Sequence, residues 1–120
     1  MFLDLIRNNG GFTLTKDLQA KQEGFACAIS GHETVHNMDT VTELDIVDYI
    51  ASKKELASKN NNLCFGSWLD TETNKLYLDL SEVLPSKKEA LKKAYKREQL
   101  AIFNLNTFES IYLKWLYYFC

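Results

Sequence analysis

The chain has 120 residues, a formal net charge of −2, 46% hydrophobic residues and 25% charged residues. This length and composition predict one folded domain with its own core and argue against disorder. The slightly negative charge argues against sequence-independent binding to phosphate backbones, which depends on clustered Lys and Arg.

The first residues predict an arm rather than part of the domain. Phe2, Leu3, Leu5 and Ile6 are compatible with one short amphipathic turn, and the run from Asn8 to Gly11 breaks it. The stretch that follows is mostly polar. We therefore expect an N-terminal arm over residues 1–23.

The first strand and the first helix of the domain come next. Residues 25–30 are apolar on both faces and lie between two glycines, which predicts a buried strand. Residues 31–39 are polar and predict a loop. Thr42 and Asp45 resemble a capping box, so a helix is expected to begin after Thr42, with Leu44, Val47 and Ile50 on its apolar side.

A β-hairpin follows, over residues 64–70 and 75–80. Leu76, Leu78 and Leu80 alternate with polar or aromatic residues, which is typical of a strand with one buried face. A four-residue loop pairs Trp68 with Tyr77, on the face opposite to these leucines.

The last part of the chain predicts a helix, a strand and a tail. Ser86 is a natural N-cap for a helix that extends to about Glu98. Residues 100–105 predict a fourth strand. Residues 111–120 are the most hydrophobic segment, and their pattern does not distinguish a strand from a helix.

The order of these elements, β-α-β-β-α-β, is that of the split βαβ or ferredoxin-like fold. We expect an α+β domain over residues 24–110, with a four-stranded antiparallel sheet and two helices on one face. The arm and an aromatic tail over residues 111–120 complete the chain.

The cysteine count and the hydropathy pattern bear on location. Cys27, Cys64 and Cys120 are odd in number and widely spaced, which argues against a disulfide framework and favours the reducing cytoplasm. No run of about 18 apolar residues is present, so we expect no membrane-spanning helix and no membrane partner.

An aromatic pair on the outer sheet face is the main candidate site. Trp68 and Tyr77, with Asp79 beside them, need a cover, which is the aromatic tail, a protein partner or a nucleic acid. Trp and Tyr are typical anchors of protein interfaces. The candidate partner-binding residues are therefore Trp68, Tyr77, Asp79, Trp115, Tyr117 and Tyr118.

Three further patterns suggest other chemistry. His32, Glu33 and His36 match H-E-x-x-H, which binds zinc when it lies on a helix, but β-branched residues and glycine disfavour a helix here. Cys27 has His32 and His36 nearby in the sequence, as a cysteine nucleophile would need. Its position in the middle of a strand favours a small buried side chain instead. We expect no catalytic residue, no metal and no cofactor.

The basic side of the second predicted helix is the last candidate. It carries Lys87, Lys88, Lys92, Lys93, Lys96 and Arg97. Interleaved Glu89 and Glu98 favour a solvated face over a binding site for RNA or for an acidic protein.

The chain contains the blocks GFxxxxSGHE from Gly24, GxWxD from Gly66 and KxYLDLSEV from Lys75. With these blocks it resembles a family of small uncharacterised phage and prophage proteins, over roughly residues 10–111. Ser67 stands where that pattern has a second glycine, and the tail from Tyr112 lies outside it. Small phage proteins without enzyme motifs are often inhibitors of host machinery, including anti-CRISPR proteins.

The resemblance implies a non-enzymatic phage protein that binds and inhibits a host protein by occluding its surface. The partner class that it implies is a defence effector such as a CRISPR–Cas complex, in the host cytoplasm. A nucleic-acid or nucleotide-binding module and a metal-dependent hydrolase remain the alternatives. A homodimer through one sheet face is also open.

Overall fold

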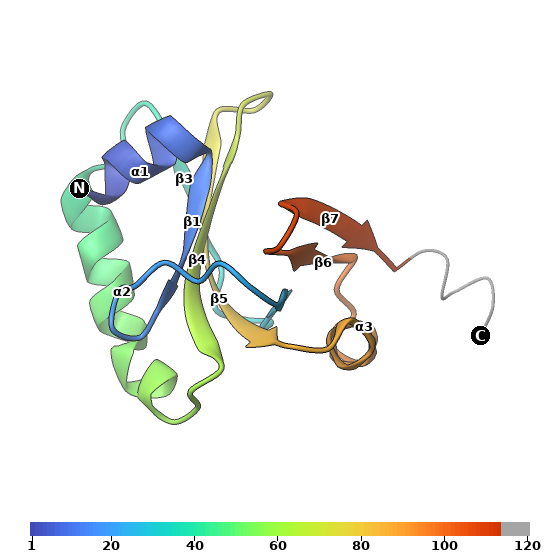
Figure 1. Ribbon diagram of the computed structural model, residues 1–120. Coiled ribbons are helices and arrows are strands. Elements are labelled where there is room, and N and C mark those ends of the chain that lie inside the picture. The colour runs from blue at the N-terminus through green and yellow to red at the C-terminus, as the bar shows by residue number, and fades with distance from the viewer. Residues whose placement is uncertain (114–120) are drawn as a thin grey trace.

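Figure 1 shows the computed structural model of the chain, of which the structure describes residues 1–113. Their elements, in chain order, are α1 (Phe2–Asn9), β1 (Gly11–Thr15), β2 (Phe25–Ala28), β3 (Thr34–Asn37), α2 (Glu43–Ser58), β4 (Leu63–Asp70), β5 (Lys75–Leu84), α3 (Lys87–Lys96), β6 (Ala101–Asn104) and β7 (Glu109–Tyr112). Within this part of the chain, the fold is α+β, with three helices and one open antiparallel sheet of seven strands.

The sheet has the order β1-β4-β5-β2-β6-β7, and β3 also pairs with β5. β5 is long enough to hold β4 along one edge and both β2 and β3 along the other. Residues between β2 and β3 bulge away from β5 before pairing resumes, since Ala28 pairs with Ser81 and Thr34 with Leu78. α1 and α2 lie on one side of the sheet, and β5 bends toward α3 at its C-terminal end (Figure 1).

The expectation of a four-stranded ferredoxin-like sheet is wrong. The four expected strands do form, and they lie side by side in the order β4-β5-β2-β6. Three strands that the sequence pattern did not predict, β1, β3 and β7, extend this group, so the sheet has no four-stranded ferredoxin-like order. β3 and β7 are four residues long and partly polar, and the alternation of β1 extends over only five residues. Pairing with neighbouring strands stabilises all three.

Residues 1–23 do not form an arm beside the sheet. α1 and β1 contribute Phe2, Ile6 and Leu14 to the largest apolar cluster, which also contains Ile46 and Phe65. Glu43 of α2 accepts hydrogen bonds from the backbone N–H groups of Phe2 and Leu3, where the first turn of a helix leaves donors unpaired. The beginning of the chain is therefore held in the core by contacts with α2.

Both expected helix starts are confirmed. Thr42 and Asp45 form the reciprocal capping box of α2, and the Ser86 hydroxyl accepts a hydrogen bond from the Glu89 N–H at the start of α3. The expected apolar side of α2 is wrong in part, because Leu44 and Val47 are exposed. Ile46, Tyr49, Ile50 and Ala57 are the buried residues of α2.

α3 is joined to the sheet through a buried carboxylate. Glu82 of β5 is only 4% exposed, and it lies 2.9 Å from Lys93 Nζ and 2.7 Å from Arg97 Nη2. Burial acts to raise the pKa of Glu82, but the hydrogen bonds from Lys93 and Arg97 outweigh it and hold that pKa below its usual value. Around this ion pair, Cys27, Leu84, Ala90, Ala94, Ile102 and Leu113 form the apolar cluster under α3.

We predict that Glu82→Gln destabilises the protein by about 1–3 kcal/mol at pH 7, because the partly exposed Lys93 and Arg97 lose their anion. The folded-state pKa of Glu82 is depressed, so its contribution is present above its ordinary value of 4.5 and disappears as pH falls through the lower folded value. Urea unfolding at pH 7 and at pH 3 measures both effects, with Glu72→Gln in the exposed β4–β5 turn as the matched control. A deficit that is equal at both pH values would contradict this account.

Candidate partner-binding surface

The β4–β5 register places the expected aromatic pair on one face. Trp68 pairs with Tyr77, Leu69 with Leu76 and Asp70 with Lys75, which confirms the predicted hairpin. The rings of Trp68 and Tyr77 are 5.4 Å apart between centroids and tilted by 31°. Because residues directly opposite each other share a face, both rings project away from the leucines that pack under α2.

This second face of the sheet is only half covered. At one end, Ala26, Cys64, Val83 and Leu105 form a buried cluster with Phe103, so the segment around β6 covers that end. At the other end Trp68 remains 57% exposed. The described residues 1–113 therefore leave the aromatic end of this face open to solvent.

Val35 extends the open end onto a third strand. It pairs with Tyr77 across the β3–β5 ladder and is 49% exposed, so Trp68, Tyr77 and Val35 form one row across β4, β5 and β3. Sequence reasoning missed Val35 because residues 31–39 predicted a loop. Its only signal was the pair of neighbouring β-branched residues, Thr34 and Val35, which favour strands.

Asp79 lies on the next rung of the same face. It pairs with Gly66, and a Cβ atom built on Gly66 would lie only 2.3 Å from Asp79 Oδ1, so the carboxylate extends over the glycine. The Ser81 hydroxyl donates a 3.1 Å hydrogen bond to the same oxygen. The absence of a side chain at position 66 thus creates the space that this carboxylate occupies.

The surroundings of Asp79 oppose its ionisation. Burial raises the pKa of Asp79 to about 6, the Ser81 hydrogen bond acts in the other direction, and the negative charge of Glu33 raises it further. No Lys or Arg among residues 1–113 forms an ion pair with Asp79. The surface defined by Trp68, Tyr77, Val35 and Asp79, called the aromatic–acid surface below, therefore holds a carboxylate without a matching cation.

β1 supports this surface from the edge. Gly11 has a φ of +157°, and a Cβ atom there would lie 2.1 Å from the Ser67 carbonyl oxygen, so β1 approaches β4 closely next to Trp68. The Ser67 hydroxyl accepts a 3.0 Å hydrogen bond from the Phe12 N–H. This bond gives Ser67 a structural role at the junction of β1 and β4. Trp115, Tyr117 and Tyr118, the other expected anchors, lie outside the described residues.

The H-E-x-x-H match does not form the helical zinc site that the pattern requires. His32 and Glu33 lie between β2 and β3, and His36 lies on β3 itself. His32 Nδ1 is 3.2 Å from Lys53 Nζ, whereas His36 Nε2 is 3.1 Å from Thr34 Oγ1. Within residues 1–113 no group of three or more His, Cys, Asp or Glu side chains is placed to hold a metal ion.

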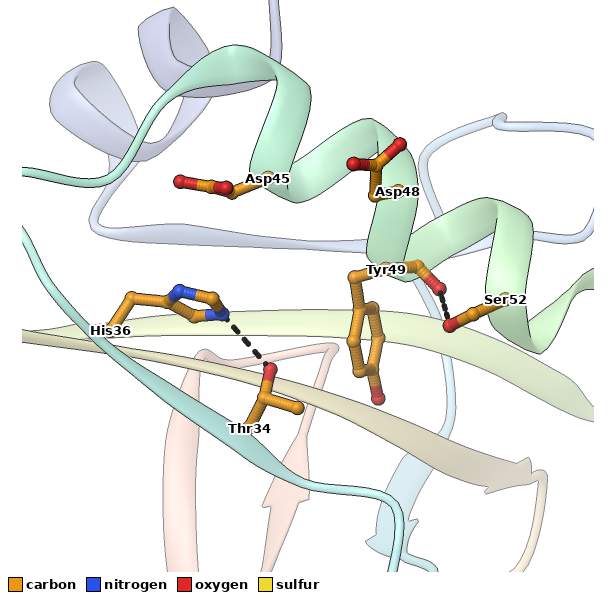
Figure 2. A pocket seen from close by; sticks show the side chains of 6 residues that line it. All are labelled: Thr34, His36, Asp45, Asp48, Tyr49 and Ser52. Carbon is orange, nitrogen blue, oxygen red and sulfur yellow. Dashed lines mark hydrogen bonds between the residues drawn. The ribbon is translucent and has the colours of Figure 1, made fainter.

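His36 instead faces a pocket between β3 and α2 (Figure 2), of about 310 Å³. Its lining residues are Thr34, His36, Asp45, Asp48, Tyr49 and Ser52. Burial raises the pKa of the Tyr49 hydroxyl, which donates a 2.6 Å hydrogen bond to the His32 carbonyl. This bond and the contact between Lys53 and His32 hold the loop before β3 against α2.

Of the remaining candidates, Cys27, Lys93 and Arg97 have structural roles. Cys27 is fully buried, and burial raises the pKa of its thiol although nearby Arg97 acts to lower it, so the geometry lacks an accessible thiolate. Of the basic residues on α3 and at its C-terminal end, Lys93 and Arg97 bind Glu82. Lys87, Lys88, Lys92 and Lys96 are exposed. No helix within residues 1–113 has the length and apolar character needed to span a membrane.

We predict that Asp79→Asn stabilises the protein at pH 8 by about 2–3 kcal/mol, because the carboxyl pKa is raised in the folded state. For an acid with a raised pKa, ionisation opposes folding, so stability falls as pH rises from the ordinary value of 3.8 toward the folded value of about 6. Urea unfolding of both proteins at pH 4 and pH 8 tests this. A difference that does not grow with pH would show that the Asp79 carboxylate is well solvated.

We also predict that Gly66→Ala destabilises the protein by about 1–3 kcal/mol, the usual cost of inserting a methyl group into a filled space. The new methyl group would meet the Asp79 carboxylate, so in an Asp79→Ala background the same change should cost much less. A double-mutant cycle by thermal or urea unfolding measures this coupling. Additive effects would mean that the carboxylate does not occupy the space over Gly66.

No protein-family model, no curated protein and no solved structure matches this chain. The resemblance to small phage proteins stays a prediction from the sequence blocks. The aromatic–acid surface contains the partner-binding candidates that the structure describes, on one face of one sheet.

Proposed function

We propose that this protein binds another protein through the aromatic–acid surface and acts by occluding the partner's surface rather than by catalysis. The observation that carries the proposal is the tilted Trp68–Tyr77 ring pair on the open half of the sheet face, with Trp68 57% exposed. Large exposed aromatic side chains held on a rigid sheet are typical anchors of protein interfaces, because they bury much area at little entropic cost.

The charge of the surface favours a protein over a nucleic acid. Stacking on Trp68 and Tyr77 would bring a nucleotide's phosphates near Asp79 and Glu33, whose negative charges repel them. The chain as a whole has a formal net charge of −2. The four exposed lysines of α3 are the basis of the alternative proposal, a nucleic-acid-binding module, which predicts affinity that falls steeply with salt.

The resemblance to phage proteins supplies the context of the proposal. It favours a host protein as the partner, and a defence effector such as a CRISPR–Cas complex is the class of target that we propose. A metal-dependent hydrolase has less support, because His32 and His36 contact different side chains within the described part of the chain.

We predict that Trp68→Ala weakens partner binding by at least about 30-fold while the domain stays folded, as expected for a hot-spot residue. The experiment captures proteins from defence-expressing host lysate with the tagged protein, with and without nuclease, and then measures the affinity of the purified partner. Leu100→Ala is the matched control, since Leu100 is 78% exposed and lies next to β6, away from the surface.

Equal binding by the wild-type protein and by Trp68→Ala would contradict the proposed surface. Recovery of a partner that is lost after nuclease treatment would favour the nucleic-acid alternative. Self-association that Trp68→Ala abolishes, measured by light scattering, would identify the second copy of this chain as the occupant.

A further inference from the structure

We propose that the aromatic–acid surface receives an arginine side chain of the partner protein, which stacks on the Trp68–Tyr77 pair and ion-pairs with Asp79. This inference rests on the proposed function and specifies its chemistry. Three observations support it: the charge of the surface, the spacing of its groups and the low solvation of its carboxylate.

Asp79 has no positively charged partner among the described residues. Asp79 accepts one hydrogen bond, from the neutral Ser81 hydroxyl, and Glu33 adds a second negative charge nearby. Glu82, the other acid in the interior of β5, is paired with both Lys93 and Arg97. Ionised carboxylates in poorly solvated sites are normally paired, so Asp79 has the environment of a site that a positive group from outside would complete.

The aromatic rings and the Asp79 carboxylate lie on neighbouring residue pairs of the same sheet face. Tyr77 and Asp79 are two residues apart on β5, and Trp68 and Gly66 are their partners on β4, so the rings and the carboxylate lie roughly 7 Å apart along the strand. A guanidinium group is planar and can lie on an aromatic face while its edge donates hydrogen bonds to a carboxylate. Lysine has a more strongly hydrated point charge and cannot make both contacts in this way.

Because burial raises the pKa of Asp79, the proposed ion pair with arginine depends on pH. The groups around Asp79 are Ser81, Gly66 and Tyr77 in the sheet and Glu33 in the loop before β3. The charge of Asp79 also raises the pKa of Tyr49 on α2, whose side chain lies on the other side of the sheet. Lys75 lies beyond Tyr77, opposite Asp70. With the pKa of free Asp79 at about 6, the carboxylate is ionised at pH 7.5 and mostly protonated at pH 5.

The test is an NMR titration of the isotope-labelled full chain with N-acetyl-arginine amide. N-acetyl-citrulline amide, which has nearly the same shape without the charge, is the matched ligand control. The Trp68 indole signal is distinguished from that of Trp115 with a Trp115→Phe variant. We expect arginine amide to shift the signals of Trp68, Tyr77 and Gly66 at pH 7.5, with binding about tenfold weaker at pH 5, where about a tenth of Asp79 is ionised.

Binding should be at least about tenfold weaker for the citrulline compound than for the arginine compound, and equally weakened for arginine with the Asp79→Asn variant. Equal shifts by arginine and citrulline, or no shift at this surface, would overturn the proposal. Signal shifts caused by the arginine compound only at the pocket that contains Asp45 and Asp48 would also overturn the proposal. Stronger shifts of the Trp68 signal with oligothymidylate would point to a nucleic acid instead.

The purified partner separates this inference from the proposed function. If Trp68→Ala abolishes partner binding and Asp79→Asn leaves it unchanged between pH 5 and pH 7.5, the arginine assignment fails and the protein-binding surface stands. If Trp68→Ala leaves partner binding unchanged, the proposed function itself fails. Loss of partner binding with both variants and at pH 5 supports the proposed function and the arginine assignment together.

Discussion

The register of the β4–β5 hairpin determines what this sheet buries and what it presents. With Trp68 opposite Tyr77, every leucine of β5 from Leu76 to Leu80 points into the cluster under α1 and α2. A slip of one residue would expose these leucines and bury the aromatic pair. The central position of β5 extends this constraint to the neighbouring strands, because β2, β3 and β4 all pair with it.

The two faces of β5 then differ in how well their polar groups are satisfied. On the side of the helices, Glu82 is buried but holds two cations, and it fixes α3 against the sheet. On the other side, Asp79 has a single neutral hydrogen-bond donor and a raised pKa of about 6. A carboxylate that opposes folding at neutral pH, next to the exposed ring of Trp68, is a local conflict of the kind that folded proteins concentrate at functional sites.

Local sequence patterns predicted the parts of the fold that depend on near neighbours. The alternation of β5, the four-residue loop and the two helix caps at Thr42 and Ser86 were all readable from the sequence. The missed parts depend on distant partners. Polar β3 is a strand because it completes the edge of β5, and α2 faces the core with Ile46 and Tyr49, because the sheet and α1 determine which side it buries. The aromatic pair was predictable, whereas the space over Gly66 and the row formed with Val35 needed the three-dimensional register.

The central claim is that the aromatic–acid surface is where this protein meets its partner. Hydrogen–deuterium exchange of the free and partner-bound protein tests it most directly, because it maps contact without altering any residue. We expect protection on binding to concentrate in β3 and in the halves of β4 and β5 that carry Trp68 and Tyr77. Protection confined to α3, or to the side of α2 that exposes Leu44 and Val47, would contradict the claim and assign the interface to a helix.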